Sequence, residues 1–213
     1  MNKWNYGNEA IEIPVQTGET WMVGDDKFVC GDINHLDIDF DYDVIYCDPP
    51  WTQALHSGFY TKAGLKGQGG VIHQTIGRIA ELSKRAKLGM FLEGSIKDTA
   101  VLDAAKAIIG EPRHTWQTTY YSKLPAVLYY FGESNLAKDF SGMDDEHTPA
   151  EALGLFNGVR VFDPCTGRGL TSRSAYQTGN KFVGTELNPR RLAIAIKRHY
   201  ELIGTEDAKP VRV

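Results

Sequence analysis

The sequence predicts an α/β protein with a doubly wound sheet, because short apolar strands alternate with amphipathic helices along most of the chain. Two strands show this most clearly. Residues 43–47 are apolar and rich in β-formers, and the double proline Pro49-Pro50 ends that strand because proline cannot continue a central strand. Residues 159–162 form a second apolar strand, which a glycine turn joins to a helix at 170–177.

The remaining elements are expected in the following order. Residues 1–20 are polar and weakly patterned, which indicates an N-terminal arm, and a hairpin follows at 21–30. Residues 52–70 hold five glycines among lysines and aromatics, which indicates a mobile substrate loop. Further strands are expected at 88–92, 114–121, 126–131 and 181–184, and helices at 71–87, 97–109, 150–156 and from 189 to about 202. The strands at 114–121 and 126–131 should form an antiparallel pair at one sheet edge.

The composition is that of a soluble globular protein. The 213 residues suit a single domain, with 42% apolar and 23% charged residues and no apolar run long enough to span a membrane. Three scattered cysteines and an N-terminus without an apolar signal segment indicate a cytoplasmic protein with reduced thiols. The six histidines have no metal-ligand spacing, so no metal is expected. The net charge of −4 argues against a surface that coats nucleic acid, so any phosphate contact must come from local basic patches or from a site for one flipped nucleotide.

The motif Asp48-Pro49-Pro50-Trp51 follows the strand at 43–47 directly. An aromatic amino nitrogen is a poor nucleophile, because its lone pair is delocalised into the ring. The Asp48 carboxylate and the Pro49 carbonyl could each accept one amino hydrogen and so favour a nitrogen that attacks a methyl sulfonium. The prolines fix the backbone, and Trp51 would stack on a base turned out of its duplex. The structural alternative is a proline turn covered by a tryptophan.

A glycine turn forms the second motif, from Asp163 through Cys165, Gly167 and Gly169 into a helix. Glycines there let the backbone approach a ligand closely, although tight packing alone would also explain them. The next strand ends at Glu186. An acid at that strand end is placed to accept hydrogen bonds from the two hydroxyls of a ribose. A solvated surface carboxylate is the alternative.

Together these residues resemble the amino-group DNA methyltransferases, and among them the circularly permuted beta class in its small phage or bacterial form. In that class the catalytic motif precedes the glycine motif, as here over residues 20–200. The resemblance implies S-adenosyl-L-methionine as cofactor, with Asp32 on its adenine and Thr148 facing its carboxylate end. It also implies a Rossmann-like class I fold, with a seven-stranded, mostly parallel sheet and one antiparallel strand.

Two departures from the family pattern bear on the site. Cys165 and Arg168 stand where the family usually has phenylalanine and a small residue, so packing around the methionine moiety must differ. The chain also has no room for a large target-recognition domain. Sequence specificity is therefore expected to be short or relaxed, or to come from a homodimer or a separate specificity subunit.

Contacts to the substrate are expected from the segment 52–70 and from the turn near residue 123. Phe59 and Tyr60 offer stacking surfaces, and Lys62, Lys66 and Lys123 offer phosphate contacts. The resemblance favours adenine N6 in DNA, because aspartate begins the catalytic motif. Three alternatives stay open: cytosine N4 in DNA, adenine in RNA, and a catalytically silent cofactor-binding subunit of a heteromeric enzyme.

Overall fold

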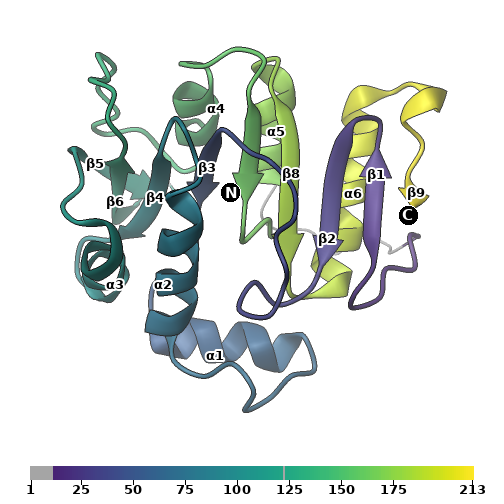
Figure 1. Ribbon diagram of the computed structural model, residues 1–213, viewed down its shortest axis with the longest axis horizontal. Helices are drawn as coiled ribbons and strands as arrows, with labels where there is room; N and C mark the ends of the chain where they lie inside the picture. The colour runs from purple at the N-terminus through teal and green to yellow at the C-terminus, as the bar shows by residue number, and fades with distance from the viewer. Residues whose placement is uncertain (1–11, 122) are drawn as a thin grey trace.

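The computed structural model describes residues 12–121 and 123–213, and it places nine strands in one mixed sheet (Figure 1). Their order across the sheet is β5-β6-β4-β3-β7-β8-β2-β1-β9. Strands β6 and β1 run opposite to the others. The strands span β1 Thr20–Val23, β2 Asp26–Cys30, β3 Val44–Cys47, β4 Met90–Ser95, β5 His114–Tyr120, β6 Leu124–Phe131, β7 Arg160–Asp163, β8 Lys181–Glu186 and β9 Val211–Arg212.

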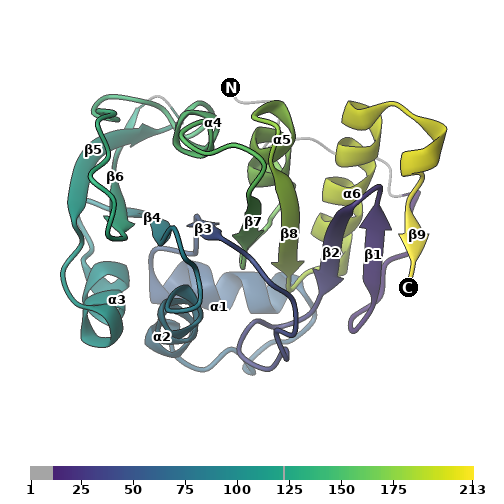
Figure 2. The same cartoon turned by 45° about the horizontal axis from the view of Figure 1, so that its top comes forward.

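Helices cover both faces of this sheet (Figure 2). Helices α4, α5 and α6 lie on one face, and α2 and α3 lie on the other, so the fold has three layers. Their bounds are α1 Gln53–Lys62, α2 Ile72–Ser83, α3 Ala100–Ile109, α4 Thr148–Leu153, α5 Leu170–Gln177 and α6 Pro189–Ile203, with a 3₁₀ turn at Glu206–Ala208. The fold class predicted from the strand–helix alternation is confirmed.

Two apolar clusters, one on each side of the sheet, form the core. The four residues of β3 are all buried, because this central strand is covered on both faces. The outer strand β5 buries only Trp116 and Thr118, as expected for an edge. Large aromatic side chains such as Phe91 and Phe162 are fully buried in these clusters, and their burial stabilises the fold.

The chain changes its winding direction between β3 and β7. From β3 it proceeds through α1 and α2 to β4 on one side, whereas from β7 it proceeds through α5 to β8 on the other. In open α/β sheets, ligands bind beyond the carboxyl ends of the strands at such a point. Helix α1 lies across these carboxyl ends (Figure 1).

The expectation of seven strands with one antiparallel is wrong, since the sheet formed by the described residues has nine strands and two of them, β1 and β6, run opposite to the rest. Strands β1 and β9 extend it beyond β2, with β9 pairing Trp21 to Arg212 and Met22 to Val211. The antiparallel pair at the other edge, β5 with β6, is confirmed.

The segment 52–70 is not irregular throughout, because its first half is helix α1. The Thr52 hydroxyl caps this helix by accepting a hydrogen bond from the Leu55 N–H at 3.3 Å. The predicted mobility of the segment stays a prediction. Of the expected N-terminal arm, residues 1–11 lie outside the described residues; Ile13 and Val15 pack against the core, and Thr20 already belongs to β1.

Candidate active site

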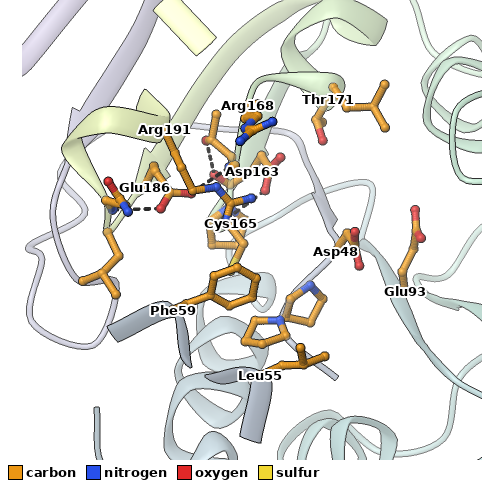
Figure 3. A pocket seen from close by; sticks show the side chains of 18 of the residues that line it. Asp48, Leu55, Phe59, Glu93, Asp163, Cys165, Arg168, Thr171, Glu186 and Arg191 are labelled. Carbon is orange, nitrogen blue, oxygen red and sulfur yellow. Dashed lines mark hydrogen bonds between the residues drawn. The ribbon is translucent and has the colours of Figure 1, made fainter. Parts of the chain in front are cut away.

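A cavity of about 850 Å³ opens at the carboxyl ends of the central strands. Its walls come from segments that are far apart in sequence: the ends of β2, β3, β7 and β8, the middle of β4, helix α1, the start of α6, and the β5–β6 turn. The cavity therefore lies at the change of winding direction, where the fold predicts a ligand site. Figure 3 shows some of the side chains that line it.

The glycine turn after β7 forms one wall of the cavity. Gly167 and Gly169 have φ angles of +58° and +86°, which favour glycine. A Cβ on Gly167 would lie 2.9 Å from a guanidinium nitrogen of Arg191, and a Cβ on Gly169 would lie 3.2 Å from the Ala195 methyl group on α6. Gly167 therefore keeps the cavity wall open, and Gly169 lets α5 and α6 approach each other.

Glu186, at the end of β8, holds this turn in place. One carboxylate oxygen accepts the Gly167 N–H at 2.8 Å, and the other accepts the Asn188 N–H at 2.8 Å. The side chain is 7% exposed and lines the cavity. A carboxylate oxygen can accept two hydrogen bonds, so each oxygen keeps acceptor capacity for a bound hydroxyl.

Asp48 follows β3 on the opposite side of the cavity from Glu186 (Figure 3). Its two oxygens accept hydrogen bonds from the indole N–H of Trp51 at 3.0 Å and from the hydroxyl of Tyr120 at 3.3 Å. The rings of Trp51 and Tyr120 meet edge to face, with centroids 4.8 Å apart. The two aromatic side chains thus fix the orientation of the carboxylate.

Four carboxyl groups crowd this part of the cavity: Asp48, Glu93, Asp145 and Asp163. Removal from water is the main cause that raises the pKa of Asp48 to about 7 and that of Asp163 to about 7. Burial, followed by the charge of Asp48, raises the pKa of Glu93 well above its usual range. Burial also raises the pKa of Asp145. Such a lining suits a ligand that carries positive charge.

Asp32, just after β2, lies at the other end of the cavity and touches helix α1. The Tyr60 hydroxyl donates to Asp32 Oδ2 at 2.6 Å, and the Asn34 side chain donates to the Tyr60 oxygen at 3.0 Å. Tyr60 is 5% exposed, so it is part of the cavity wall rather than an exposed stacking surface. His56 on the same helix is also buried and contacts the Thr75 hydroxyl at 2.9 Å.

Phe59 and Lys62 of α1 face the last helix. The Arg191 guanidinium lies 4.8 Å from the Phe59 ring centroid, and the Lys62 amino group lies 5.6 Å from it. The Asn188 side chain donates to the Lys62 carbonyl at 3.1 Å. The C-terminal end of helix α1 is therefore held on two sides, by Asp32 and by the start of α6.

The cavity brings together most of the residues that the sequence indicated. Its lining includes the following of them: Asp32, Asp48, Pro49, Pro50, Trp51, Phe59, Tyr60, Lys62, Asp163, Cys165, Gly167 and Glu186. Four others do not line it. The Thr148 side chain is buried and donates to the Asp144 carbonyl at 2.6 Å, Gly169 lies behind the turn, and Lys66 and Lys123 are exposed outside the cavity.

Sequence reasoning missed several residues of the lining. Tyr46, Glu93, Asp145 and Arg191 were not expected in the site, and Tyr120 was expected mainly to pack in the sheet. A signal existed for one of them. Glu93 interrupts an otherwise apolar strand, and a buried acid within a strand is uncommon without a function or a partner.

Within the described residues, no cluster of three or more histidine, cysteine, aspartate or glutamate side chains has the geometry of a metal site. Across the same residues, every helix is too short or too polar to cross a bilayer.

Several solved structures resemble this chain. TTHA0409, a candidate DNA modification methylase from Thermus thermophilus, aligns with a TM-score of 0.60 and 13% identity over 83% of this chain and 95% of its own. The complex of M1.HpyAVI with SAM aligns with a TM-score of 0.59 and 15% identity over 81% and 98% of the two chains. The cytosine-N4-specific PvuII DNA methyltransferase aligns with a TM-score of 0.57 and 12% identity over 89% and 94%.

TTHA0409 has also been solved in complex with S-adenosyl-L-methionine. No protein-family model matches the sequence, and no curated protein matches it. Identities of 12–15% establish the fold alone. The chain therefore has the α/β fold of these DNA methyltransferases.

Proposed function

We propose that this protein is an S-adenosylmethionine-dependent methyltransferase that methylates the exocyclic N6 of adenine in DNA. The observation that carries the proposal is the shared cavity. Asp48 and Pro49, a pair of acceptors suited to an amino group, face the same space as Gly167 and Glu186, although more than a hundred residues separate them along the chain. The proposal includes the circularly permuted beta class, in which the catalytic motif precedes the glycine motif.

The cavity fits the cofactor in three respects. Gly167 lines the cavity without a side chain, so a ligand can approach the backbone of the turn closely. Glu186 is oriented by two backbone N–H groups and keeps acceptor capacity for ribose hydroxyls. The acidic lining suits a sulfonium cation. Asp32 would accept from the adenine amino group, as the resemblance implies, in competition with or in addition to the Tyr60 hydroxyl.

When bound, the cofactor supplies an electrophilic methyl carbon and leaves as S-adenosylhomocysteine. Asp48 in its ionised form and the Pro49 carbonyl accept the two amino hydrogens of the target. This draws the nitrogen lone pair out of the aromatic ring and towards the methyl carbon. As the new N–C bond forms, Asp48 stabilises the positive charge on nitrogen and is placed to take the proton that is lost.

Trp51 has two roles in this proposal. Its indole N–H orients Asp48, and its ring face remains the candidate surface on which the extruded base stacks. Phe59 and Lys62, at the cavity rim, are the candidate contacts to the flanking nucleotides, with Lys66 and Lys123 further out. The neighbours named as DNA methyltransferases support DNA as the polymer, and a flipped nucleotide suits a protein of net charge −4.

The test is mass spectrometry of nucleosides from DNA and from RNA after incubation with methyl-labelled cofactor. We expect labelled N6-methyladenine in DNA. Labelled N4-methylcytosine in DNA, or labelled N6-methyladenine in RNA, would show that the substrate is a different one and that the reaction is still methyl transfer to an amino group. Absence of label in every nucleoside, from a protein that binds the cofactor, would identify a silent subunit instead. The intact acceptor pair at Asp48 and Pro49 argues against that last outcome.

A further inference from the structure

Glu93 lies in the middle of β4 and is 4% exposed, yet it lines the cavity beside Asp48 (Figure 3). One carboxyl oxygen accepts the Tyr46 hydroxyl at 2.5 Å. Among residues 12–121 and 123–213, no hydrogen bond reaches the other oxygen and no cation pairs with the side chain. A buried acid that lines a cavity with one oxygen free of protein partners can form a hydrogen bond to a ligand there.

Glu93 and Asp48 differ in what surrounds them. Asp48 accepts two hydrogen bonds, from Trp51 and Tyr120, and Arg191 also favours its charged form. Glu93 accepts one, from Tyr46. Other titratable groups also face Glu93. The negative charges of Asp48, Asp145 and Asp163 raise its pKa, and its own charge raises the pKa of the Tyr120 hydroxyl.

Of the two acids, Glu93 is therefore the one expected to carry a shared proton. Crowding disfavours two adjacent negative charges, and the better-solvated and better-bonded Asp48 keeps the charge. The pKa of Glu93 is raised well above its ordinary range, which agrees with this assignment. The pair thus presents an acceptor at Asp48 and an O–H donor at Glu93 on the same side of the cavity.

We propose that Glu93 binds the ring nitrogen next to the target amino group, N1 of adenine or N3 of cytosine, by donating its carboxyl O–H. Both bases present the same edge, an amino donor beside a ring-nitrogen acceptor. An ionised Asp48 and a protonated Glu93 form its complement. This inference rests on the proposed function and adds the residue that selects the base.

The same arrangement explains which bases would be rejected. Guanine carries a ring N–H next to its amino group, so the Glu93 O–H would face another donor. Thymine and uracil have no exocyclic amino group for Asp48. A site that hydrogen-bonds a substrate atom rejects analogues that lack the atom more strongly than an apolar pocket does, because its own polar group is left unpaired.

A substrate with one altered atom tests this directly. The methylated sequence is first identified by sequencing DNA from cells that express the protein. Duplexes then carry adenine, 1-deazaadenine or 7-deazaadenine at the target position, or cytosine and 3-deazacytosine if cytosine is the target. For the parent protein we expect 1-deazaadenine to lower kcat/KM at least about tenfold relative to adenine. With 7-deazaadenine, which keeps N1, no such loss is expected.

Variants show whether Glu93 is the donor. In Glu93→Ala, the ratio of kcat/KM for adenine to that for 1-deazaadenine should fall to about one. Any difference that remains in this variant measures the intrinsic difference between the two amino groups, and the parent's ratio is compared with it. Glu93→Gln keeps an N–H donor and should restore the preference for adenine. Leu92→Ala is the matched control, because it disturbs the same strand outside the cavity and should leave the preference unchanged.

The outcomes separate this inference from the proposed function. If the parent methylates 1-deazaadenine within about twofold of adenine, the ring nitrogen is not read and the inference is overturned, while methyl transfer stands; that comparison needs no variant to fold. If the parent discriminates and Glu93→Ala discriminates equally, another residue is the donor. If no base is methylated, the proposed function has failed, and the assignment of Glu93 fails with it.

Discussion

The indole N–H of Trp51 donates to a carboxylate oxygen of Asp48 three residues earlier, at 3.0 Å. The Tyr120 hydroxyl, from the edge strand β5, donates to the second oxygen at 3.3 Å. Both bonds favour the ionised acid and oppose the effect of burial, which brings the pKa of Asp48 to about 7. The two aromatic residues therefore help to keep ionised the group on which the proposed chemistry depends.

The first prediction concerns the pH dependence of methyl transfer. In the parent, kcat/KM should rise as pH rises through about 7, because Asp48 acts in its ionised form. Trp51→Phe keeps a ring for stacking and removes the N–H donor, so the pKa of Asp48 should rise and this limb should move to higher pH. Tyr120→Phe should move it in the same direction. Superimposable pH profiles for all three proteins would disprove the control of Asp48 by these rings.

The second prediction concerns stability, with Asp48→Asn. An unfolded aspartate has a pKa of about 3.9, and the folded value is raised to about 7, so the folded state binds more protons between these limits. The stability that the protonated form contributes is therefore full below about pH 4 and is lost as pH rises towards about 7. Asparagine does not ionise, so the free energy of unfolding of the variant does not fall with pH on account of this residue. Above neutrality the variant should be more stable than the parent by roughly 1–3 kcal/mol, and the gain should shrink towards acid pH.

Urea unfolding at several pH values measures this difference. The same variant should lose about two to four orders of magnitude in turnover, because it lacks the charge that stabilises the transition state. A gain in stability together with a loss of activity would show that Asp48 is kept for chemistry. Equal stability at all pH values would contradict the raised pKa.

The residues predicted from sequence are those whose chemistry lies in a short local pattern. The turn Asp48–Trp51, the glycines at 167 and 169, and Glu186 each follow a recognisable strand, and parallel strands bring their carboxyl ends to one edge. This explains why the cavity contains nearly all of them. The edge strand β9 has only two residues, which is too short for any periodicity, so no local pattern predicted it. The count of seven strands came from the resemblance, and β1 of the expected hairpin joins the same sheet.

The missed residues depend on tertiary contacts. Tyr120 and Asp145 reach the cavity only because β5 and the segment before α4 lie near the end of β3, and nothing local in their sequence marks this. Helix α1 is different. Its buried His56 and Tyr60 are four residues apart, a helical spacing that the neighbouring glycines and lysines obscured. The helix buries Tyr60 against Asp32, which the composition of a loop could not predict.

The third prediction concerns Glu186 and cofactor affinity. Glu186→Ala removes both the acceptor for ribose hydroxyls and the bonds that hold Gly167 and Asn188, so binding should weaken by roughly 1–3 kcal/mol in titration calorimetry. Glu186→Gln keeps one acceptor oxygen and should lose less. An unchanged affinity in the alanine variant would remove Glu186 from the cofactor site.

The last prediction concerns the two lysines near α1. Lys62 lies at the cavity rim with its amino group over Phe59, whereas Lys66 is exposed beyond it. If both contact phosphates, each releases about one counterion when DNA binds, so log Kd against log salt should flatten by about 0.9 for each lysine replaced by alanine. Cofactor affinity should not change, because neither amino group takes part in the proposed cofactor contacts.

Binding of the identified duplex is measured over a series of salt concentrations. Lys181→Ala is the control. It removes the same charge at the amino end of β8, and the cavity lies at the carboxyl ends of the strands. It should leave the slope unaltered. Lys62→Ala should additionally raise KM, since this side chain borders the space where the flipped base would enter. A double variant that binds DNA like the parent at every salt concentration would place the phosphate contacts elsewhere, and Arg190 and Arg191 at the start of α6 would then be the next residues to replace.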